Sequence, residues 1–311
     1  MDNRVTELSP LGRRIERALL TCRAAKLAFP GAFMEIAGRP TGKDSVVVAL
    51  RDDPVLRDGR GELNICALAA LLDAPLGTAS DMQTGPRIRP ATAHIELQLT
   101  GAATQGDVAV EARFVGFSEQ SRVRQSLVRA DIRAGGNLVG HATGTCVLLD
   151  LPPDQPRLPW PWLPEDFSFE SLQGLALDAA EAEGLAAGVA ADSAATAEQP
   201  FIEHFWCGIP QARQGGASHR IPVARHLANR GGHVQGGLLL GMAMRVAHAA
   251  TPADMRLSNI SAYFISPGLG PVLDVESTVI QQGRSLAVVR TSIRAASGKL
   301  VLEASSQHVL A

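Results

Sequence analysis

The stretch GGHVQGGLLLGMAM, residues 231–244, decides the fold of this chain. Its glycine-rich beginning is typical of a turn that feeds a helix, and the run that follows carries no charge until Arg245. A helix that is apolar on every side has to be surrounded by protein. The segment therefore predicts a wrapped central helix whose first backbone N–H groups are free to bind something.

A second segment of the same kind occurs in the first half of the chain. GELNICALAALLDAPLG (61–77) aligns without a gap with GHVQGGLLLGMAMRVAH (232–248). Later in each half, residues 128–149 and 288–310 share the pattern V-R-x-x-I-R-A, then a glycine-containing turn, then Leu-Val, which is typical of a hairpin. The same order of elements in both halves indicates an internal repeat.

Each half is predicted to contain two short strands, the long apolar helix, and three or four long strands joined by turns. Antiparallel strands in hairpin order around one helix indicate an α+β fold in which the sheet curls around that helix. We expect short strands at 33–39, 45–50, 201–209 and 219–224, and the late strands of the first half at 94–100, 107–117, 121–134 and 138–149.

A connector separates the two halves. Residues 151–165 (LPPDQPRLPWPWLPE) hold six prolines, which cannot continue a helix or a central strand. An Ala-rich stretch follows and predicts a linker helix that frays toward residue 198. We therefore expect an N-terminal domain at 1–150, a linker at 151–200 and a C-terminal domain at 201–311.

Composition limits the partners and the location. The chain has 311 residues, 46% of them hydrophobic and 19% charged, with a formal net charge of −2. Such a balance gives no long-range attraction to nucleic acid or anionic lipid. Charges interrupt the first 20 residues, and no stretch of 18 apolar residues follows. We expect a cytoplasmic protein with no nucleic-acid or membrane partner.

The four cysteines show neither CxxC spacing nor a Cys/His ligand pattern, so we expect buried free thiols in preference to a metal site or disulfides. They are Cys22, Cys66, Cys146 and Cys207.

The motif N-x-x-G-x-V-(H/Q)-G-G at residues 229–237, at the start of a wrapped helix, resembles the hotdog-fold acyl-CoA thioesterases. The likeness is to the 4-hydroxybenzoyl-CoA and phenylacetyl-CoA thioesterase type, and it covers both halves but neither the N-terminal helix nor the linker. It implies two tandem hotdog domains that form a pseudo-dimer, and hydrolysis of an acyl-CoA substrate without a cofactor. Family members often associate further, so a homodimer of double-hotdog chains is expected.

The resemblance also implies which residues form the active site. In that family one unit supplies a glycine N–H at the helix start and an amide seven residues earlier, and the other unit supplies a carboxylate from its own helix. These positions correspond here to Gly236, Asn229 and Asp73, with Gln235 at the His-or-Gln position. A hydroxyl that positions water is expected early in the next strand, where Thr92 is the nearest candidate.

The complementary positions of the repeat have lost these groups. Met244 stands where the second half would supply its carboxylate, and Ile65 and Asp58 stand where the first half would supply its glycine and amide. One complete active site per chain is therefore expected. In it, free N–H groups at the helix start would stabilise the oxyanion, and Asp73 would activate water or attack the thioester directly.

Each of these residues also has a purely structural interpretation. Asn229 is a common turn residue, Gln235 suits a helix start, and paired glycines allow close helix packing. Asp73 lies just before a proline and could be a solvated residue near a helix end. His226 and His233 could act as bases, although a histidine beside a turn is more often structural.

Two other functions stay open on the sequence alone. Hotdog proteins include acyl-thioester dehydratases and hydratases, which combine a histidine with an acid, and His226 would be the histidine. A non-catalytic acyl-CoA binding protein is the other alternative. Arg230 and Arg245 are candidates for holding the CoA nucleotide.

Overall fold

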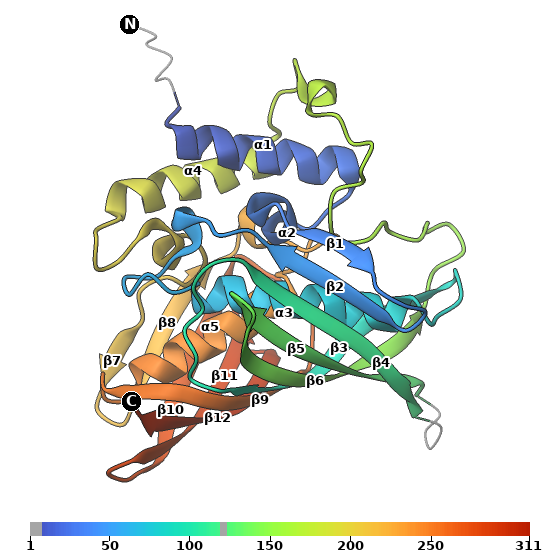
Figure 1. Ribbon diagram of the computed structural model, residues 1–311. Coiled ribbons are helices and arrows are strands. Elements are labelled where there is room, and N and C mark those ends of the chain that lie inside the picture. The colour runs from blue at the N-terminus through green and yellow to red at the C-terminus, as the bar shows by residue number, and fades with distance from the viewer. Residues whose placement is uncertain (1–7, 119–122) are drawn as a thin grey trace, which may run out of the picture.

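The computed structural model describes residues 8–118 and 123–311. The strands in these ranges form one twelve-stranded sheet in the order β1-β2-β4-β5-β6-β3-β9-β12-β11-β10-β8-β7, with every neighbouring pair antiparallel (Figure 1). The first half contributes β1 (Ala37–Pro40), β2 (Ser45–Leu50), β3 (Ile88–Leu99), β4 (Val108–Ser118), β5 (Gln125–Ala134) and β6 (Asn137–Asp150). The second half contributes β7 (Gln211–Arg213), β8 (Gly216–Pro222), β9 (Met255–Phe264), β10 (Val272–Gln282), β11 (Leu286–Ala295) and β12 (Leu300–Leu310).

The sheet is continuous across the middle of the molecule. There β3 pairs with β9, from His94 opposite Tyr263 to Gln98 opposite Asn259. The order of strands on either side of this seam is the same when it is counted outward, as the repeat in the sequence predicts. The two halves are therefore related by a pseudo-two-fold axis at the seam.

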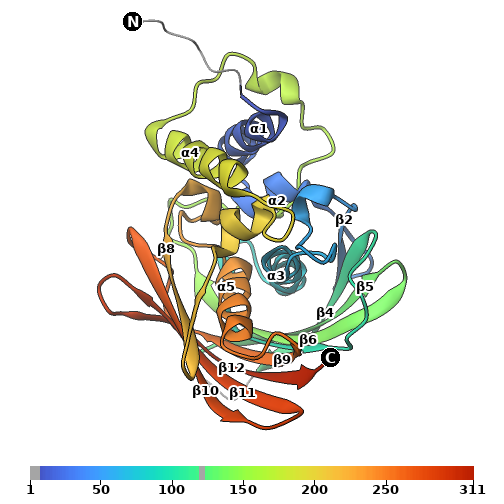
Figure 2. The ribbon, with the colours of Figure 1, turned by 90° about the vertical axis from the view of Figure 1, so that its left-hand side faces the viewer.

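Two helices, α3 (Ile65–Asp81) and α5 (Gly236–Ala249), lie side by side in the concave face of the curved sheet (Figure 2). Their backbones approach closely. A Cβ at Gly237 would lie 2.4 Å from the carbonyl oxygen of Ala69, and one at Gly241 would lie 2.5 Å from a Cα atom of α3. Side chains cannot be accommodated at these two positions, so the glycines permit the central helix pair. The predicted α+β architecture with wrapped helices is confirmed.

The remaining helices form a layer on the far side of α3 and α5 (Figures 1 and 2). An ion pair of 3.0 Å between Arg23 and Glu181 joins α1 to α4, and α4 begins with a capping box made by Asp178 and Glu181. This layer comprises α1 (Pro10–Ala25), α2 (Phe29–Met34) and α4 (Ala179–Ala194), with the short 3₁₀ segments η1 (Pro54–Leu56), η2 (Phe169–Leu172) and η4 (Arg225–Leu227) and the π-helical segment η3 (Glu203–Cys207).

The strand predicted at 33–39 is observed only from Ala37, where β1 begins, and the strand predicted at 201–209 is wrong. Residues 29–34 form α2, and the equivalent stretch from 201 to 207 is helical and ends in η3. Both stretches place phenylalanines four residues apart, which aligns them on one helix face. Phe33 and Phe205 lie 5.4 Å apart between ring centroids, and Phe201 lies 4.8 Å from Phe205. Burial of these rings favours helix over strand. The predicted strand 121–134 is observed from residue 125, and its residues 121 and 122 lie outside the described residues.

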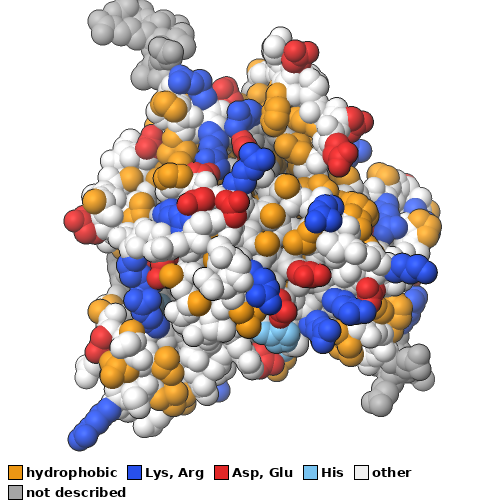
Figure 3. All heavy atoms as spheres, viewed as in Figure 1, with side chains coloured by type: hydrophobic (Ala, Val, Ile, Leu, Met, Phe, Trp, Pro, Cys, Tyr) orange, Lys and Arg blue, Asp and Glu red, His pale blue; other side chains and the backbone are white. Residues whose placement is uncertain are grey.

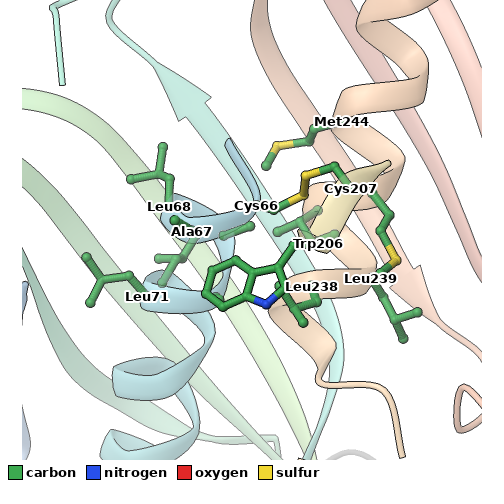
Figure 4. Close-up of a cluster of buried hydrophobic side chains, with 14 of the residues drawn as sticks. Cys66, Ala67, Leu68, Leu71, Trp206, Cys207, Leu238, Leu239 and Met244 are labelled. Carbon is green, nitrogen blue, oxygen red and sulfur yellow. A yellow bond between two sulfur atoms is a disulfide. The ribbon is translucent and has the colours of Figure 1, made fainter. Parts of the chain in front are cut away.

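The expectation of four free thiols is wrong for two of them. Cys66, in the first turn of α3, and Cys207, at the end of η3, form a disulfide between the two halves (Figure 4). The two residues are 141 positions apart, so no local spacing indicates the pair. The fold brings their Cα atoms to 6.5 Å, within the usual range for a disulfide. Cys22 and Cys146 are free and buried, as expected.

Acidic and basic side chains are interspersed over the face seen in Figure 3. Among the described residues, no helix combines the length and the apolar character needed to cross a membrane.

Candidate active site

The side chain of Asp73 extends from α3, and its carboxylate contacts the beginning of α5. Its Oδ2 accepts hydrogen bonds from the side-chain amide of Gln235 at 3.0 Å and from the backbone N–H of Gly237 at 3.2 Å. Its Oδ1 accepts one from the hydroxyl of Thr92 on β3, at 2.9 Å. Three donors, one from β3 and two from the beginning of α5, thus hold the carboxylate in one orientation.

Gln235 is fixed by its position before the helix. It is the N-cap of α5, where its Oε1 accepts a hydrogen bond from the N–H of Leu238 at 2.9 Å. Since the oxygen is used for the cap, the amide nitrogen is the atom that reaches Asp73. Capping the helix and orienting the carboxylate are therefore two roles of a single side chain.

Gly236 is the first residue of α5, and its N–H makes no hydrogen bond within the described part of the chain. A Cβ at this position would lie 3.1 Å from Oδ2 of Asp73. A methyl group here would press on the facing carboxylate, and the N–H beside that carboxylate is available to an acceptor. Gly237, by contrast, serves helix packing and donates its own N–H to Asp73.

The surroundings of Asp73 affect its acidity in opposite directions. Burial is the largest influence and raises the pKa of Asp73 above its usual value. The hydrogen bonds from Thr92 and Gly237 and the positive charge of Arg230 oppose this rise because they favour the ionised form. The group is therefore a stronger base than an ordinary surface aspartate.

Asn229 is held in a turn. Its Oδ1 accepts hydrogen bonds from the backbone N–H groups of Gly231 at 2.8 Å and His233 at 3.1 Å. This matches the structural interpretation of the residue, but the turn uses only the oxygen. The amide nitrogen makes no hydrogen bond to the described residues, and Asn229 lines the same cavity as Asp73 without contacting it.

These residues border a cavity of about 440 Å³ that both halves and the connector enclose. Its walls include α3, the start of β3, the turn before α5 and the end of β9. The sequence does not indicate that the connector contributes Trp160 to this cavity, because its prolines predict only an extended segment between the halves. The cavity brings together all five residues selected from the sequence: Asp73, Thr92, Asn229, Gln235 and Gly236.

A second cavity, of about 130 Å³, occupies the pseudo-symmetric position. Counted from the helix starts, Met244 on α5 takes the place of Asp73, and Ile65 takes the place of Gly236. Asp58 lines this cavity as well, and Met244 belongs to the buried cluster drawn in Figure 4. A carboxylate on the helix and a glycine at the facing helix start are therefore both missing here.

Larger side chains also fill this second cavity. Counting from the helix starts, Arg245 and His248 take the places of Ala74 and Gly77. Glu203 corresponds to Gly31 of α2 when the phenylalanines of the two segments are aligned. Its carboxylate pairs with Arg245 at 2.5 Å. Arg245 is thus committed to an ion pair away from the Asp73 cavity, so it is not placed to hold a nucleotide there.

The histidines do not form an acid–base pair with Asp73. His226 is buried, with Nε2 3.1 Å from the carbonyl oxygen of Phe205 and its ring stacked on that phenylalanine. Burial lowers the pKa of His226 to about 4. His233 lines the cavity, but its described hydrogen bonds belong to the turn around Asn229.

Comparison with known proteins supports the fold described above. Residues 225–307 match the family model described as the acyl-CoA thioesterase N-terminal domain. Solved structures similar to the chain include the tesB protein of Mycobacterium avium subsp. paratuberculosis, with a TM-score of 0.51, 15% identity, and coverage of 97% of this chain and 100% of that one. The 12:0-ACP thioesterase of Umbellularia californica gives a TM-score of 0.52 and 12% identity, with 86% and 94% covered.

A conserved protein with a hotdog fold from Alicyclobacillus acidocaldarius also matches, with a TM-score of 0.50, 9% identity, and coverage of 88% and 96%. The chain is a tandem double hotdog. No curated protein sequence is significantly similar to it. At these identities the solved structures establish the fold, and the one family model covers the second hotdog, including the helix start that faces Asp73.

Proposed function

We propose that the chain hydrolyses acyl-CoA thioesters at the single site around Asp73. The observation that carries the proposal is the Asp73 carboxylate, held by Thr92, Gln235 and Gly237 at the floor of a cavity shared by both hotdogs. The match of residues 225–307 to a thioesterase domain supports the same reaction class.

The chemistry follows from the unpartnered groups that line the cavity. As a nucleophile attacks the thioester carbon, negative charge develops on the carbonyl oxygen. The free N–H of Gly236, at the positive end of the α5 dipole, is placed to accept that charge, and the amide nitrogen of Asn229 can donate a second hydrogen bond. Gly236 and Asn229 thus form the proposed oxyanion site.

Asp73 supplies the base. It takes a proton from water while the hydroxide attacks the carbonyl carbon, and the C–S bond then breaks to release the acid and the CoA thiolate, which takes up the proton. In the alternative route, the carboxylate attacks directly and water hydrolyses the resulting anhydride. Neither route requires a cofactor, since the CoA belongs to the substrate.

The mouth of the cavity suits the phosphates of CoA. Arg89 and Arg230 both line the cavity with exposed side chains, and Arg230 donates a hydrogen bond to the carbonyl oxygen of Pro159. Two neighbouring arginines favour a phosphate between them. Trp160 and Phe264 line the same cavity, so aromatic acyl-CoAs such as the 4-hydroxybenzoyl and phenylacetyl thioesters belong in the substrate panel.

Dehydration of an acyl thioester is not favoured, because His226 is buried among aromatic rings and pairs with no carboxylate of the described residues. The test is release of free thiol from a panel of aliphatic and aromatic acyl-CoAs, with the absorbance of enoyl-CoA followed in parallel. We expect thiol release without any enoyl signal. Tight binding of acyl-CoA without thiol release would instead indicate a non-catalytic binding protein.

A single-turnover reaction in ¹⁸O-water distinguishes the two routes. Label in the peptide that contains Asp73 identifies the carboxylate as the nucleophile, because water then attacks the aspartyl carbon. Label confined to the released acid is expected when Asp73 activates water.

A further inference from the structure

One face of α3 continues beyond Asp73 along the wall of the cavity. Asp73, Gly77 and Asp81 are spaced four residues apart, so they lie on the same side of the helix. All three line the cavity. From Asp73 to Asp81 the helix rises about 12 Å. At the far end, Asp81 is bound by Arg157 of the connector, whose guanidinium donates to its carboxylate at 2.7 Å.

Strand β3 runs beside this helix face. Thr92 donates to Asp73 at one end of the face, and the residues back to Ile88 at the start of β3 line the same cavity. Pro159–Pro161 of the connector close the groove from the third side, with Trp160 at their centre. Helix, strand and connector thus form a groove that begins at the carboxylate and ends at the ion pair of Asp81.

The connector is held firmly in this position. The ring of Trp160 packs against that of Trp162 at 5.1 Å between centroids. A Cβ at Gly38 on β1 would lie 2.4 Å from the Trp162 ring, and one at Gly31 would lie 2.8 Å from the carbonyl oxygen of Pro161. Glycines on two elements therefore let the connector sit close to the domain it covers.

Gly77 leaves the middle of the groove open. A Cβ at this position would have no heavy atom within 4 Å, so the glycine is not required by packing. The corresponding residue on α5 is His248, which lines and helps to fill the smaller second cavity. This position of the helix therefore accepts a side chain as large as that of His248. In the Asp73 cavity the residue is glycine, and the space that a side chain would occupy is open.

The ends of the groove differ in chemistry from its middle. At one end lies the reacting carboxylate, and at the other the Asp81–Arg157 ion pair; covering that pair with an apolar chain would carry a desolvation cost. Ile88 of β3 and Trp160 of the connector line the same cavity as Gly77. The arginines suited to phosphate, Arg89 and Arg230, are exposed. The open space over Gly77, in a cavity that Ile88 and Trp160 also line, is therefore the better place for an apolar acyl group.

Resting on the proposed function, we propose that the acyl group of the substrate lies along α3 over Gly77, between Asp73 and the Asp81–Arg157 ion pair. Gly77 and Trp160 then determine its size, and the ion pair limits its length to roughly the 12 Å that separates the two aspartates along the helix. The preferred substrates are thioesters of apolar acyl groups that fill this groove.

The test compares wild type with Gly77→Ala and Gly77→Leu over acyl-CoAs of increasing chain length, starting from acetyl-CoA. Both variants replace glycine in a helix with a better helix former, so folding is expected to be retained. For Gly77→Leu we expect kcat/KM to fall at least about tenfold for the long substrates, with acetyl-CoA little changed and Gly77→Ala intermediate. Ala190→Leu, at an exposed position of α4, is the matched control and should leave the length profile unchanged.

Trp160→Ala widens the same groove and should shift the preference toward bulkier acyl groups. An equal loss for acetyl-CoA and long acyl-CoAs in Gly77→Leu would overturn the inference, because the groove would then hold the CoA arm. An unchanged length profile in both variants would overturn it as well.

The inference is also tested by binding, which separates it from the proposed function. Calorimetric titration in an Asp73→Asn background gives Kd for each chain length without turnover. If wild type releases no thiol, the proposed function fails, while a selective loss of affinity for long acyl-CoAs in Gly77→Leu would still support the acyl groove. Equal affinities with and without the leucine would reject the groove independently of activity.

Discussion

Oδ2 of Asp73 and the amide nitrogen of Gln235 are 3.0 Å apart, although 162 positions separate the residues in the chain. The contact joins the first hotdog to the second and exists only because α3 and α5 pack with their backbones in contact. Gln235 also caps α5, so the start of one helix and the carboxylate of the other are fixed by the same side chain. Substitution of Gln235 should therefore affect both the stability of the helix start and the orientation of the carboxylate.

Asp73→Asn is expected to lower kcat/KM for thioester hydrolysis by at least about 100-fold, since it retains the shape of the side chain and removes the base. Affinity for a non-hydrolysable acyl-CoA analogue should remain similar. Asp131→Asn, which alters an exposed aspartate paired with His141 outside the cavity, is the control. Unchanged turnover in Asp73→Asn would contradict the assignment of Asp73 as the catalytic carboxylate.

The pH dependence should reveal the environment of the same carboxylate. Only the ionised form acts as a base, so kcat/KM should rise with pH through the pKa of Asp73, which burial places above the usual value for aspartate. Thr92→Val removes a hydrogen bond that favours the ionised form of Asp73. The acidic limb of the pH profile of kcat/KM should therefore move to still higher pH. A limb that moves to lower pH in this variant would contradict the role of the hydroxyl.

Gly236→Ala should damage the site without damaging the fold. The added methyl group would lie 3.1 Å from Oδ2 of Asp73 and would displace the carboxylate or the helix start. Alanine is the better helix former, so the thermal midpoint should not fall while kcat/KM does. Gly116→Ala, where a Cβ has open space in β4, controls for the substitution itself. Full activity in Gly236→Ala would show that the close approach of the Asp73 carboxylate to the backbone of residue 236 is not needed for catalysis.

The main features of the fold were predictable because they depend on patterns that repeat along the chain. Two apolar helices and a duplicated hairpin indicate two wrapped units whatever their detailed packing. The relation of Asp73 to Gln235 and Gly236 is implied by the resemblance to the hotdog thioesterases, whose offsets along the helices apply to this chain, and the structure brings these residues together. Such offsets survive sequence drift because helical geometry fixes them.

Other features depend on contacts that no local pattern shows. The segment around Phe201 is rich in β-formers, but burial of its rings against those of α2 makes it helical. Cys66 and Cys207 meet only after both halves have packed. Trp160 of the connector lines the cavity, and Gly31 and Gly38 leave room for its neighbours Pro161 and Trp162, which the sequence alone does not indicate.

The disulfide leads to a prediction about stability. Under denaturing conditions without reductant, alkylation should label two thiols, those of Cys22 and Cys146, and all four after reduction. Cys207→Ser removes a link between distant positions, and typical losses on removing a disulfide are about 2–4 kcal/mol. Its thermal midpoint should therefore fall, and reductant should have no further effect on it. Four labelled thiols in the unreduced protein would show that the pair does not form.

The two cavities should differ in function because different side chains line them. Each chain is expected to bind one acyl-CoA, because the second cavity holds Met244 and Ile65 where the first holds Asp73 and Gly236. Calorimetric titration with a non-hydrolysable acyl-CoA analogue measures the number of sites, and two equivalent sites per chain would contradict the asymmetry.

Restoring an acid at the mirror position should not restore activity. In an Asp73→Asn background, Met244→Asp places a carboxylate opposite Ile65, whose side chain stands where the active site has a glycine and an approachable N–H. The ion pair of Arg245 with Glu203 and the ring of His248 would still fill the space available to a substrate. Thiol release by this double variant should therefore stay at the level of Asp73→Asn alone. Recovery of activity would show that the carboxylate was the only group the second hotdog had lost, and that the filled cavity can still admit a thioester.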